Sequence, residues 1–499
     1  MENFWDYSVW GTLNVVAVLL ASLLVGNILK KTIGFLKNSL IPISVLGGGI
    51  LIFVAWVYKL ITGDIMFDTA FFGSSGTKTL EMFTYHCLAL GFIASTLKTS
   101  DGKITKERAV EVFNTGVTTV STYLLQAILG FGITIVAAAF FIPDFFEAAG
   151  VLLPFGYGQG TGQAMNYGGI YENEYGFNGG KSFGLTIAAL GFLSASIGGV
   201  IHLNLIKRKG MITRKNSVKE IHENIEAEDE IPMQESIDKM TVQIALIIVG
   251  YMITYFIMNL LGNLLPGMRS VIFGFNFIIG VLSATLIKET MRFLKKKNAI
   301  QRNYTNNFLL TRASNFFFDI MVVSGIAAIR LSVLEEYWGI MLILGIVGLF
   351  STYFYNHYVA KKLFPEYAEE QFLMMYGMLT GTASTGTILL REIDGDFETP
   401  AADNMVYQNF PAIVFGFPMM LLATLAPQKP ALTMVILVLF FALMNIILFR
   451  KQIFKICKKT KVKKKRCLKK QAPLFCWNFL KDNGIGLYQK RKEKEKCQC

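Results

Sequence analysis

Two short Gly-Thr-rich stretches, one in each half of the chain, carry polar groups that could bind a ligand. The first runs from Gly156 to Ala164 and the second from Gly377 to Thr387, and both adjoin long apolar segments. Glycine exposes backbone N–H and C=O groups, and Thr, Ser and Gln add hydrogen-bonding side chains. Such groups are tolerated at membrane depth only where they line a protein cavity. A matched pair of Gly-interrupted apolar segments therefore predicts the binding site of a transporter.

These residue types suit a carboxylate substrate. Helices that start at such breaks direct free N–H groups and the positive end of the helix dipole toward the ligand, and glycines let the backbone approach it. Arg391 could pair with a carboxylate bidentately, or could simply anchor the cytoplasmic side. The candidate substrate residues are Gln159, Gly160, Thr161, Gly162, Gln163, Asn166, Thr380, Gly381, Thr382, Ala383, Ser384, Thr385 and Arg391.

Sodium prefers hard oxygen ligands, which unwound carbonyls and hydroxyls near the two breaks would supply. Asp319 is a further candidate because a carboxylate inside an apolar run is costly unless it is paired or hydrated. The candidate sodium ligands are Gly158, Ser384, Thr387, Asp319 and Asn404. The alternative interpretation of both stretches is that Gly and Thr only allow tight helix packing.

The composition indicates an all-α polytopic membrane protein, because 53% of residues are hydrophobic and only 17% are charged. Runs of about 20 apolar residues are long enough to cross the hydrocarbon core. We expect about 11 transmembrane helices, at residues 8–29, 40–61, 79–97, 115–142, 182–205, 240–261, 270–287, 308–331, 337–355, 406–426 and 431–449.

The net charge of +13 comes from the C-terminal tail. Residues 450–499 contain 18 Lys and Arg against 3 Asp and Glu, whereas the rest of the chain contains 30 basic and 32 acidic residues. A basic segment beside the last crossing suits the anionic cytoplasmic leaflet. Five of the six cysteines also lie in this tail, and their spacing is typical of scattered thiols rather than of a metal site.

Loop charges orient the chain by the positive-inside rule. They place the N-terminus outside, the C-terminus in the cytoplasm, and the two Gly-Thr stretches on re-entrant hairpins that enter from opposite faces. The pairs Gly160-Thr161 and Gly381-Thr382 are 221 residues apart. We therefore expect an inverted 5+5 repeat with these parts: residues 1–205 with a hairpin near 147–175, a cytoplasmic linker at 206–239, residues 240–426 with a hairpin near 366–391, an extra helix at 427–449 and the tail at 450–499.

At these motifs the chain resembles the sodium/glutamate symporter family. Residues 158–164 are similar to that family's Gly-His-Gly-Thr-Ala-Ala-Ala hairpin tip, with Gln159 where the family usually has His. Gly176-Phe177-Asn178 and the Gly-rich crossing to Gly198-Gly199 are also similar, and the segment from Gly381 to Thr385 resembles the second hairpin. The resemblance extends over roughly residues 11–426.

The resemblance implies a sodium-coupled symporter of an acidic amino acid, with a dimerising scaffold, a mobile domain that carries both hairpins, and elevator-type alternating access. We expect a plasma-membrane homodimer that carries glutamate or a similar small organic anion and binds no nucleic acid. Another carboxylate or a neutral amino acid is the alternative substrate, because of Gln159. A channel-like pore is a more distant alternative, and the absence of a His-Glu-x-x-His motif and the presence of only 4 histidines argue against an enzyme.

Overall fold

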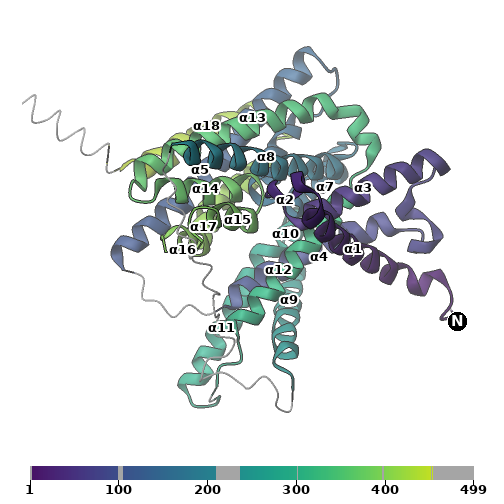
Figure 1. Ribbon diagram of the computed structural model, residues 1–499, viewed down its shortest axis with the longest axis horizontal. Helices are drawn as coiled ribbons and strands as arrows, with labels where there is room; N and C mark the ends of the chain where they lie inside the picture. Colours follow the sequence, from purple (N-terminus) through teal and green to yellow (C-terminus); the bar gives the residue numbers. More distant parts are fainter. Residues whose placement is uncertain are drawn as a thin grey trace, which may run out of the picture. The chain divides into compact units, whose positions relative to one another are not determined.

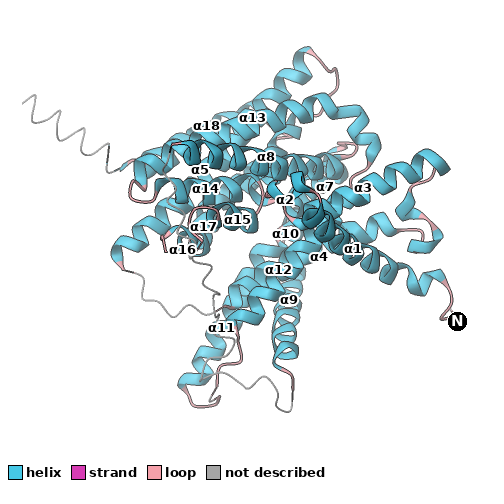
Figure 2. Ribbon diagram, in the orientation of Figure 1, coloured by secondary structure: helices cyan, strands magenta, loops and turns pink. Residues whose placement is uncertain are grey.

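The computed structural model describes residues 3–98, 105–209, 237–300, 302–395, 398–450 and residue 452. Within these ranges all regular structure is helical, and no strand occurs (Figure 2). Most of the predicted linker and nearly all of the basic tail, with its five cysteines, lie outside the described residues. The chain divides into two units, Met1–Met444 and Asn445–Cys499, and the architecture described below belongs to the first.

The first half contains a series of long helices followed by a broken pair and one further helix. Its helices are α1 (Tyr7–Thr32), α2 (Gly34–Asn38), α3 (Ile43–Thr62), α4 (Gly76–Leu97), α5 (Lys106–Phe140), α6 (Leu152–Gln159), α7 (Thr161–Tyr175) and α8 (Gly180–Arg208). Short 3-10 turns at Met66–Asp68, Ala70–Phe72 and Glu147–Val151 connect some of them.

The second half has the same order of elements. Its helices are α9 (Lys239–Leu264), α10 (Arg269–Gly274), α11 (Asn276–Lys296), α12 (Asn307–Ala327), α13 (Leu331–Leu363), α14 (Ala368–Thr380), α15 (Ala383–Arg391), α16 (Ala401–Tyr407) and α17 (Asn409–Leu425). A 3-10 turn at Pro266–Met268 precedes α10, and α18 (Pro430–Leu448) follows the second half.

Eleven segments of the described chain are long and apolar enough to cross a membrane if each bent pair counts as one span. Nine are single helices, and two are pairs that bend sharply, by 74° between α10 and α11 and by 52° between α16 and α17. Each of the eleven corresponds to one predicted crossing. The prediction of a polytopic all-α membrane protein is therefore confirmed, and the two bends are features that hydropathy alone does not reveal.

The helices pack as two groups. Group A consists of α1, α3, α4, α9, α11 and α12, in which α4 packs on α9, α11 and α12 and α3 packs on α1 and α12. Group B consists of α5 to α8 and α13 to α17, in which α13 packs on α5, α8 and α14. Figure 1 shows α4, α9, α11 and α12 together and, apart from them, α5, α8, α13 and α14.

Glycine allows the closest helix contacts in group B, as expected when helices pack without a hydrophobic driving force. A β-carbon on Gly150 would clash with the backbone of Gly130 in α5, and one on Gly184 in α8 would clash with the carbonyl of Ala164 in α7. Small residues therefore let α5 pack directly on the 3-10 turn before α6, and α8 directly on α7.

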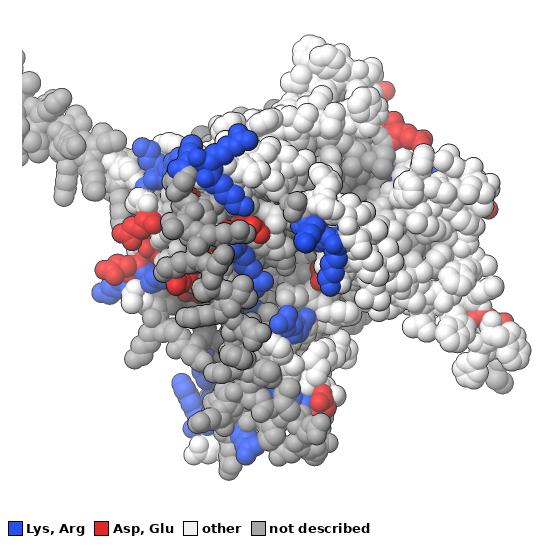
Figure 3. Space-filling model, viewed as in Figure 1, with Lys and Arg blue, Asp and Glu red and all other residues white. Residues whose placement is uncertain are grey.

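The surface over α1 and α3 carries few charges, and the lysines of these helices, Lys30, Lys31 and Lys59, lie in their last turns (Figure 3). Large apolar side chains are exposed along both helices, including Leu24 at 66% and Phe53 at 61%. Exposed apolar area of this extent suits contact with lipid or with another membrane helix rather than with water.

Candidate functional site

The first Gly-Thr stretch breaks one helix into α6 and α7. The break is at Gly160, whose φ of 82° and ψ of −174° define a conformation essentially restricted to glycine. Thr161 starts α7 and is fully buried. The hydroxyl of Tyr123 in α5 donates a hydrogen bond to the carbonyl of Gly158, 3.0 Å away, and so supports the end of α6.

The second Gly-Thr stretch joins α14 to α15 through Gly381 and Thr382. The Thr382 hydroxyl caps α15 by accepting a hydrogen bond from the Thr385 backbone N–H at 3.4 Å. The two helices fold back on each other, because a β-carbon on Gly377 of α14 would lie only 2.7 Å from the Cα of Gly386 in α15. Glycine at both positions therefore permits this contact.

The two breaks lie beside each other in the structure. A β-carbon on Gly160 would lie 4.0 Å from the carbonyl oxygen of Gly381 and 4.0 Å from the Cγ2 of Thr382. The third neighbour at this distance is the methyl group of Met321 in α12. Segments 221 residues apart in the sequence thus form one polar junction between α6, α7, α14 and α15.

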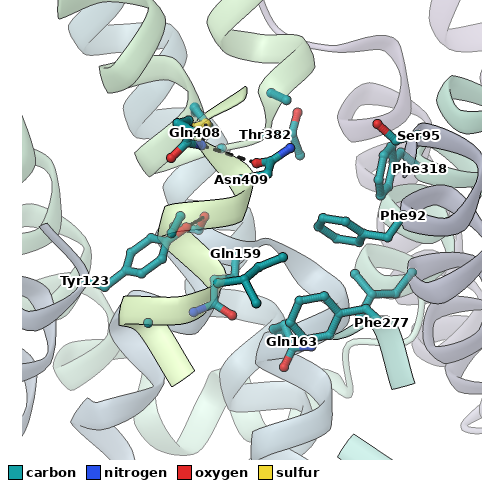
Figure 4. Close-up of a pocket in the computed structure, with 18 of the residues that line it drawn as sticks. Phe92, Ser95, Tyr123, Gln159, Gln163, Phe277, Phe318, Thr382, Gln408 and Asn409 are labelled. Carbon is teal, nitrogen blue, oxygen red and sulfur yellow. Dashed lines mark hydrogen bonds between the residues drawn. The ribbon is translucent and has the colours of Figure 1, made fainter. Parts of the chain in front are cut away.

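A cavity of about 190 Å³ adjoins this junction (Figure 4). Its group A wall includes Leu88, Phe92 and Ser95 of α4, Phe277 of α11 and Phe318 and Met321 of α12. Its group B wall includes Tyr123 of α5, Gly158 and Gln159 of α6, Gln163 of α7, residues 378 and 381–384, and six residues from Gln408 to Met420. The cavity therefore lies between the two helix groups. An engineered cavity of about 150 Å³ binds benzene, so this volume suits a small molecule.

The cavity combines phenyl rings with carboxamides. Figure 4 shows the rings of Phe92 and Phe318 opposite Gln408 and Asn409, with Gln159 and Gln163 on the α6–α7 side. Gln163 is only 1% exposed, and no described residue hydrogen-bonds its Oε1 or Nε2. The buried Oε1 of Gln159 is also without a partner among the described residues. Polar atoms that are buried in this way are costly unless something bonds to them.

Six of the predicted substrate residues line the cavity: Gln159, Gln163, Gly381, Thr382, Ala383 and Ser384. Gly160 forms the junction beside it. Of the predicted sodium ligands, Gly158 and Ser384 also line it. The remaining predicted residues lie elsewhere in the described structure: Thr161, Gly162, Asn166, Thr380, Thr385, Thr387, Asp319, Arg391 and Asn404.

Several of these remaining hydroxyl and amide groups bond to backbone. The Thr161 hydroxyl donates to the carbonyl of Met321 at 3.3 Å, and the Thr380 hydroxyl to that of Tyr376 at 2.6 Å. Thr387 donates to the carbonyl of Ala383 at 3.0 Å, and the Asn166 side chain to that of Gly274 at 3.4 Å. These bonds favour a packing role for this part of the two motifs.

The charged candidates, Arg391 and Asp319, and the amide Asn404 are not among the residues that line the cavity. Arg391 ends α15, at the opposite end of that helix from Thr382, and is exposed. Asp319 is exposed on α12. Asn404 of α16 is fully buried and donates hydrogen bonds to the Tyr367 hydroxyl at 3.0 Å and to the Gln371 Oε1 at 3.2 Å, while its own Oδ1 has no partner among the described residues.

Sequence reasoning missed the contribution of the bent pair α16–α17 and of the aromatic residues. Gln408 and Asn409 lie at the bend, and the Gln408 Oε1 accepts a hydrogen bond from Thr119 of α5 at 2.9 Å. Two adjacent carboxamides just before Pro411, inside an otherwise apolar run, were the available signal. Nothing in the sequence distinguishes Phe92, Phe277 or Phe318 from the other phenylalanines.

Two further polar clusters lie outside the cavity. Lys181 of α8 bonds to Glu81 of α4 at 2.7 Å, and Arg330 lies 3.7 Å from Glu81. In the second cluster, His202 of α8 contacts Glu369 at the start of α14 at 2.8 Å. This hydrogen bond from His202 lowers the pKa of the Glu369 carboxyl, although burial opposes the change.

Comparison with known proteins adds one positive result. A family model described as sodium/glutamate symporter matches residues 9–364 of the chain. The matched region extends from within α1 to the end of α13, includes the break at Gly160, and ends before α14. No curated protein matches the chain.

Proposed function

The chain belongs to the sodium/glutamate symporter family, and from this membership we propose that it is a sodium-coupled secondary transporter of a small amino acid or related organic anion. Glutamate is the first candidate substrate, because the family takes its name from it. The family consists of membrane transporters, so this chain is a transporter and not an enzyme.

One observation carries the proposal of a substrate site: the two Gly-Thr breaks, one from each half of the chain, meet beside a single cavity. The N-terminus of α15 lies there, and the positive end of its dipole favours a carboxylate, although the Thr385 N–H is already bonded to the Thr382 hydroxyl. A shared site between two discontinuous helices is the arrangement that secondary transporters use.

Alternating access would follow from movement of group B against group A. The cavity suits this mechanism because its walls come from both groups, so that movement would carry the residues of the two breaks past α4 and α12. The matching order of elements in the two halves supports the inverted 5+5 repeat, with α6–α7 and α14–α15 as the two re-entrant hairpins. A homodimer in the plasma membrane, with its N-terminus outside and its C-terminus in the cytoplasm, completes the proposal.

Sodium would bind near the two breaks. Ser384 brings a hydroxyl to the cavity, and Gly158 lines it with backbone at the end of α6. Hydroxyl and carbonyl oxygens are hard ligands of the kind that sodium prefers. Among the five predicted ligands, these two line the cavity, whereas Asn404, Thr387 and Asp319 do not.

Uptake by proteoliposomes tests this function. Purified protein would be reconstituted, and uptake of labelled glutamate, aspartate and citrate would be measured with an inward sodium gradient and then with potassium alone. We expect concentrative uptake only with sodium, and its loss when a sodium ionophore collapses the gradient. Uptake that is indifferent to sodium would contradict the coupling.

A further inference from the structure

The walls of the cavity between the two breaks contain no charged side chain among the described residues that line it. Its polar groups are the carboxamides of Gln159, Gln163, Gln408 and Asn409 and the hydroxyls of Ser95, Tyr123, Thr382 and Ser384. Arg391, the one basic residue in the second Gly-Thr hairpin, lies at the other end of α15 and is exposed. These described walls therefore offer hydrogen bonds, but no fixed cation for a second carboxylate.

A dicarboxylate substrate is poorly matched to such walls. One carboxylate can use the N-terminal end of α15, where Thr382 is the cap. A second carboxylate would lose its hydration and would contact only phenyl rings and neutral amides. Burying a carboxylate without a cation or a full set of donors costs far more than burying a neutral amide.

Gln163 provides a second, independent observation. Its side chain is 1% exposed and lines the cavity, and neither its Oε1 nor its Nε2 is bonded to a described residue. A carboxamide needs both an acceptor for its N–H groups and a donor for its oxygen. Another carboxamide supplies both at once, whereas a carboxylate can only accept.

We infer that the substrate is a neutral α-amino acid whose side chain ends in a carboxamide, and that Gln163 pairs with this amide. The inference rests on the proposed function, because it takes the cavity as the transport site. The α-carboxylate occupies the N-terminal end of α15, and the unpartnered Oε1 of Gln159 accepts a hydrogen bond from the substrate ammonium. The phenyl rings of Phe92 and Phe318 cover the aliphatic part of the substrate.

Two pairs of nearly isosteric amino acids test the inference. Glutamine and glutamate, and likewise asparagine and aspartate, differ only in an amide against a carboxylate. Binding to the purified full-length protein in sodium would be measured by calorimetry, and uptake by proteoliposomes with a sodium gradient. We expect each amide to bind at least about tenfold more tightly than its acid, because one buried charged or unpaired group is worth at least that factor.

The possible outcomes separate this inference from the function on which it rests. Sodium-driven uptake that prefers glutamate or aspartate would overturn the inference and leave the sodium-coupled symporter intact. Tighter binding of the amides, together with uptake that does not depend on the sodium gradient, would support the inference and overturn the coupling of transport to sodium. Binding of neither pair in sodium would overturn the inference, and the uptake of citrate would then decide the function.

A variant pair tests the role of Gln163 itself. Gln163→Met keeps the length of the side chain and removes its polar atoms, and Gln428→Met is the matched control on an exposed loop. We expect Gln163→Met to weaken amide binding about tenfold while its ligand-free melting temperature stays equal or rises, because an unpaired buried amide is lost. Unchanged affinity in Gln163→Met, with Gln428→Met also unchanged, would overturn the pairing.

Discussion

Gly160 and Gly381 lie beside each other at the junction of the two broken helix pairs, although 221 residues separate them in the sequence. A β-carbon on Gly160 would be 4.0 Å from the carbonyl oxygen of Gly381. Each half of the chain thus contributes one break to the same cavity, and neither half contains the site alone. A movement that separates the two breaks would therefore disrupt the binding site.

Gly160→Ala tests whether the backbone conformation at this junction matters. The nearest neighbours of the added methyl group are 4.0 Å away, so the cost comes from φ of 82° rather than from a clash. We expect a loss of about 1–3 kcal/mol in the free energy of unfolding, together with loss of transport. Thermal unfolding in detergent and uptake by proteoliposomes measure the two effects.

The matched control is Gly339→Ala in α13, where an added β-carbon meets nothing within 4 Å. An alanine inside a helix is favoured over glycine by about 0.5–1 kcal/mol, so this variant should be neutral or slightly more stable. If Gly160→Ala has the melting temperature and the transport rate of the wild type, the junction does not depend on a glycine at position 160.

The spans were predictable from the sequence because apolar runs of membrane length are a strong signal, and all eleven appear in the described helices. The breaks at Gly160 and Gly381 were also predictable, since glycine and threonine interrupt those runs. Which residues line the cavity was harder to predict from the sequence. Thr161 and Thr382 are equivalent in the two motifs, yet only Thr382 lines the cavity, because α12 covers Thr161. Which side of a buried helix faces a cavity depends on packing across the whole chain.

Thr382→Val and Thr161→Val should therefore differ. Valine at position 382 removes a hydroxyl that both caps α15 and lines the cavity, so we expect transport to fall at least about tenfold and stability to fall by about 1 kcal/mol. Valine at position 161 removes only the hydrogen bond to Met321, so transport should stay within about a factor of three. Uptake rates normalised to the amount of reconstituted protein provide the measurement. Equal losses in the two variants would favour a binding role for Thr161 as well.

The ion pair between Lys181 and Glu81 joins group B to group A and should affect movement rather than binding. The Nζ of Lys181 lies 2.7 Å from the Oε2 of Glu81, and the side chains are only 24% exposed for Lys181 and 15% exposed for Glu81. If the two groups move against each other, this contact must break during the cycle. We expect Lys181→Met to change the maximal uptake rate at least about threefold while the apparent substrate affinity stays within a factor of two.

Glu289→Gln is the control for Lys181→Met, because it removes a pair with Arg292 that is exposed and lies within α11. Such surface pairs contribute about 0–1 kcal/mol, so neither rate nor affinity should change. A Lys181→Met variant with wild-type uptake kinetics would show that the contact does not limit the cycle.

The pair between His202 and Glu369 should make stability depend on pH in the acidic range. The hydrogen bond from His202 lowers the pKa of Glu369 below its ordinary value of 4.5, and the nearby His357 and Lys361 act in the same direction. A carboxyl whose pKa is lower in the folded state contributes stability above its unfolded pKa, and this stability is lost as the pH falls through the folded pKa.

At neutral pH, Glu369→Gln should therefore melt a few degrees below the wild type, corresponding to about 1–3 kcal/mol for a hydrogen bond to a charged group. The difference should begin to shrink below about pH 4.5, where the unfolded chain takes up the proton, and should be lost as the pH falls through the lower folded-state pKa. The exposed Glu366, three residues before Glu369, provides the control, since Glu366→Gln should melt at the wild-type temperature at neutral pH. A difference between Glu369→Gln and the wild type that stays constant as the pH falls from 7 to well below 4.5 would show that the carboxylate charge is not what stabilises this contact.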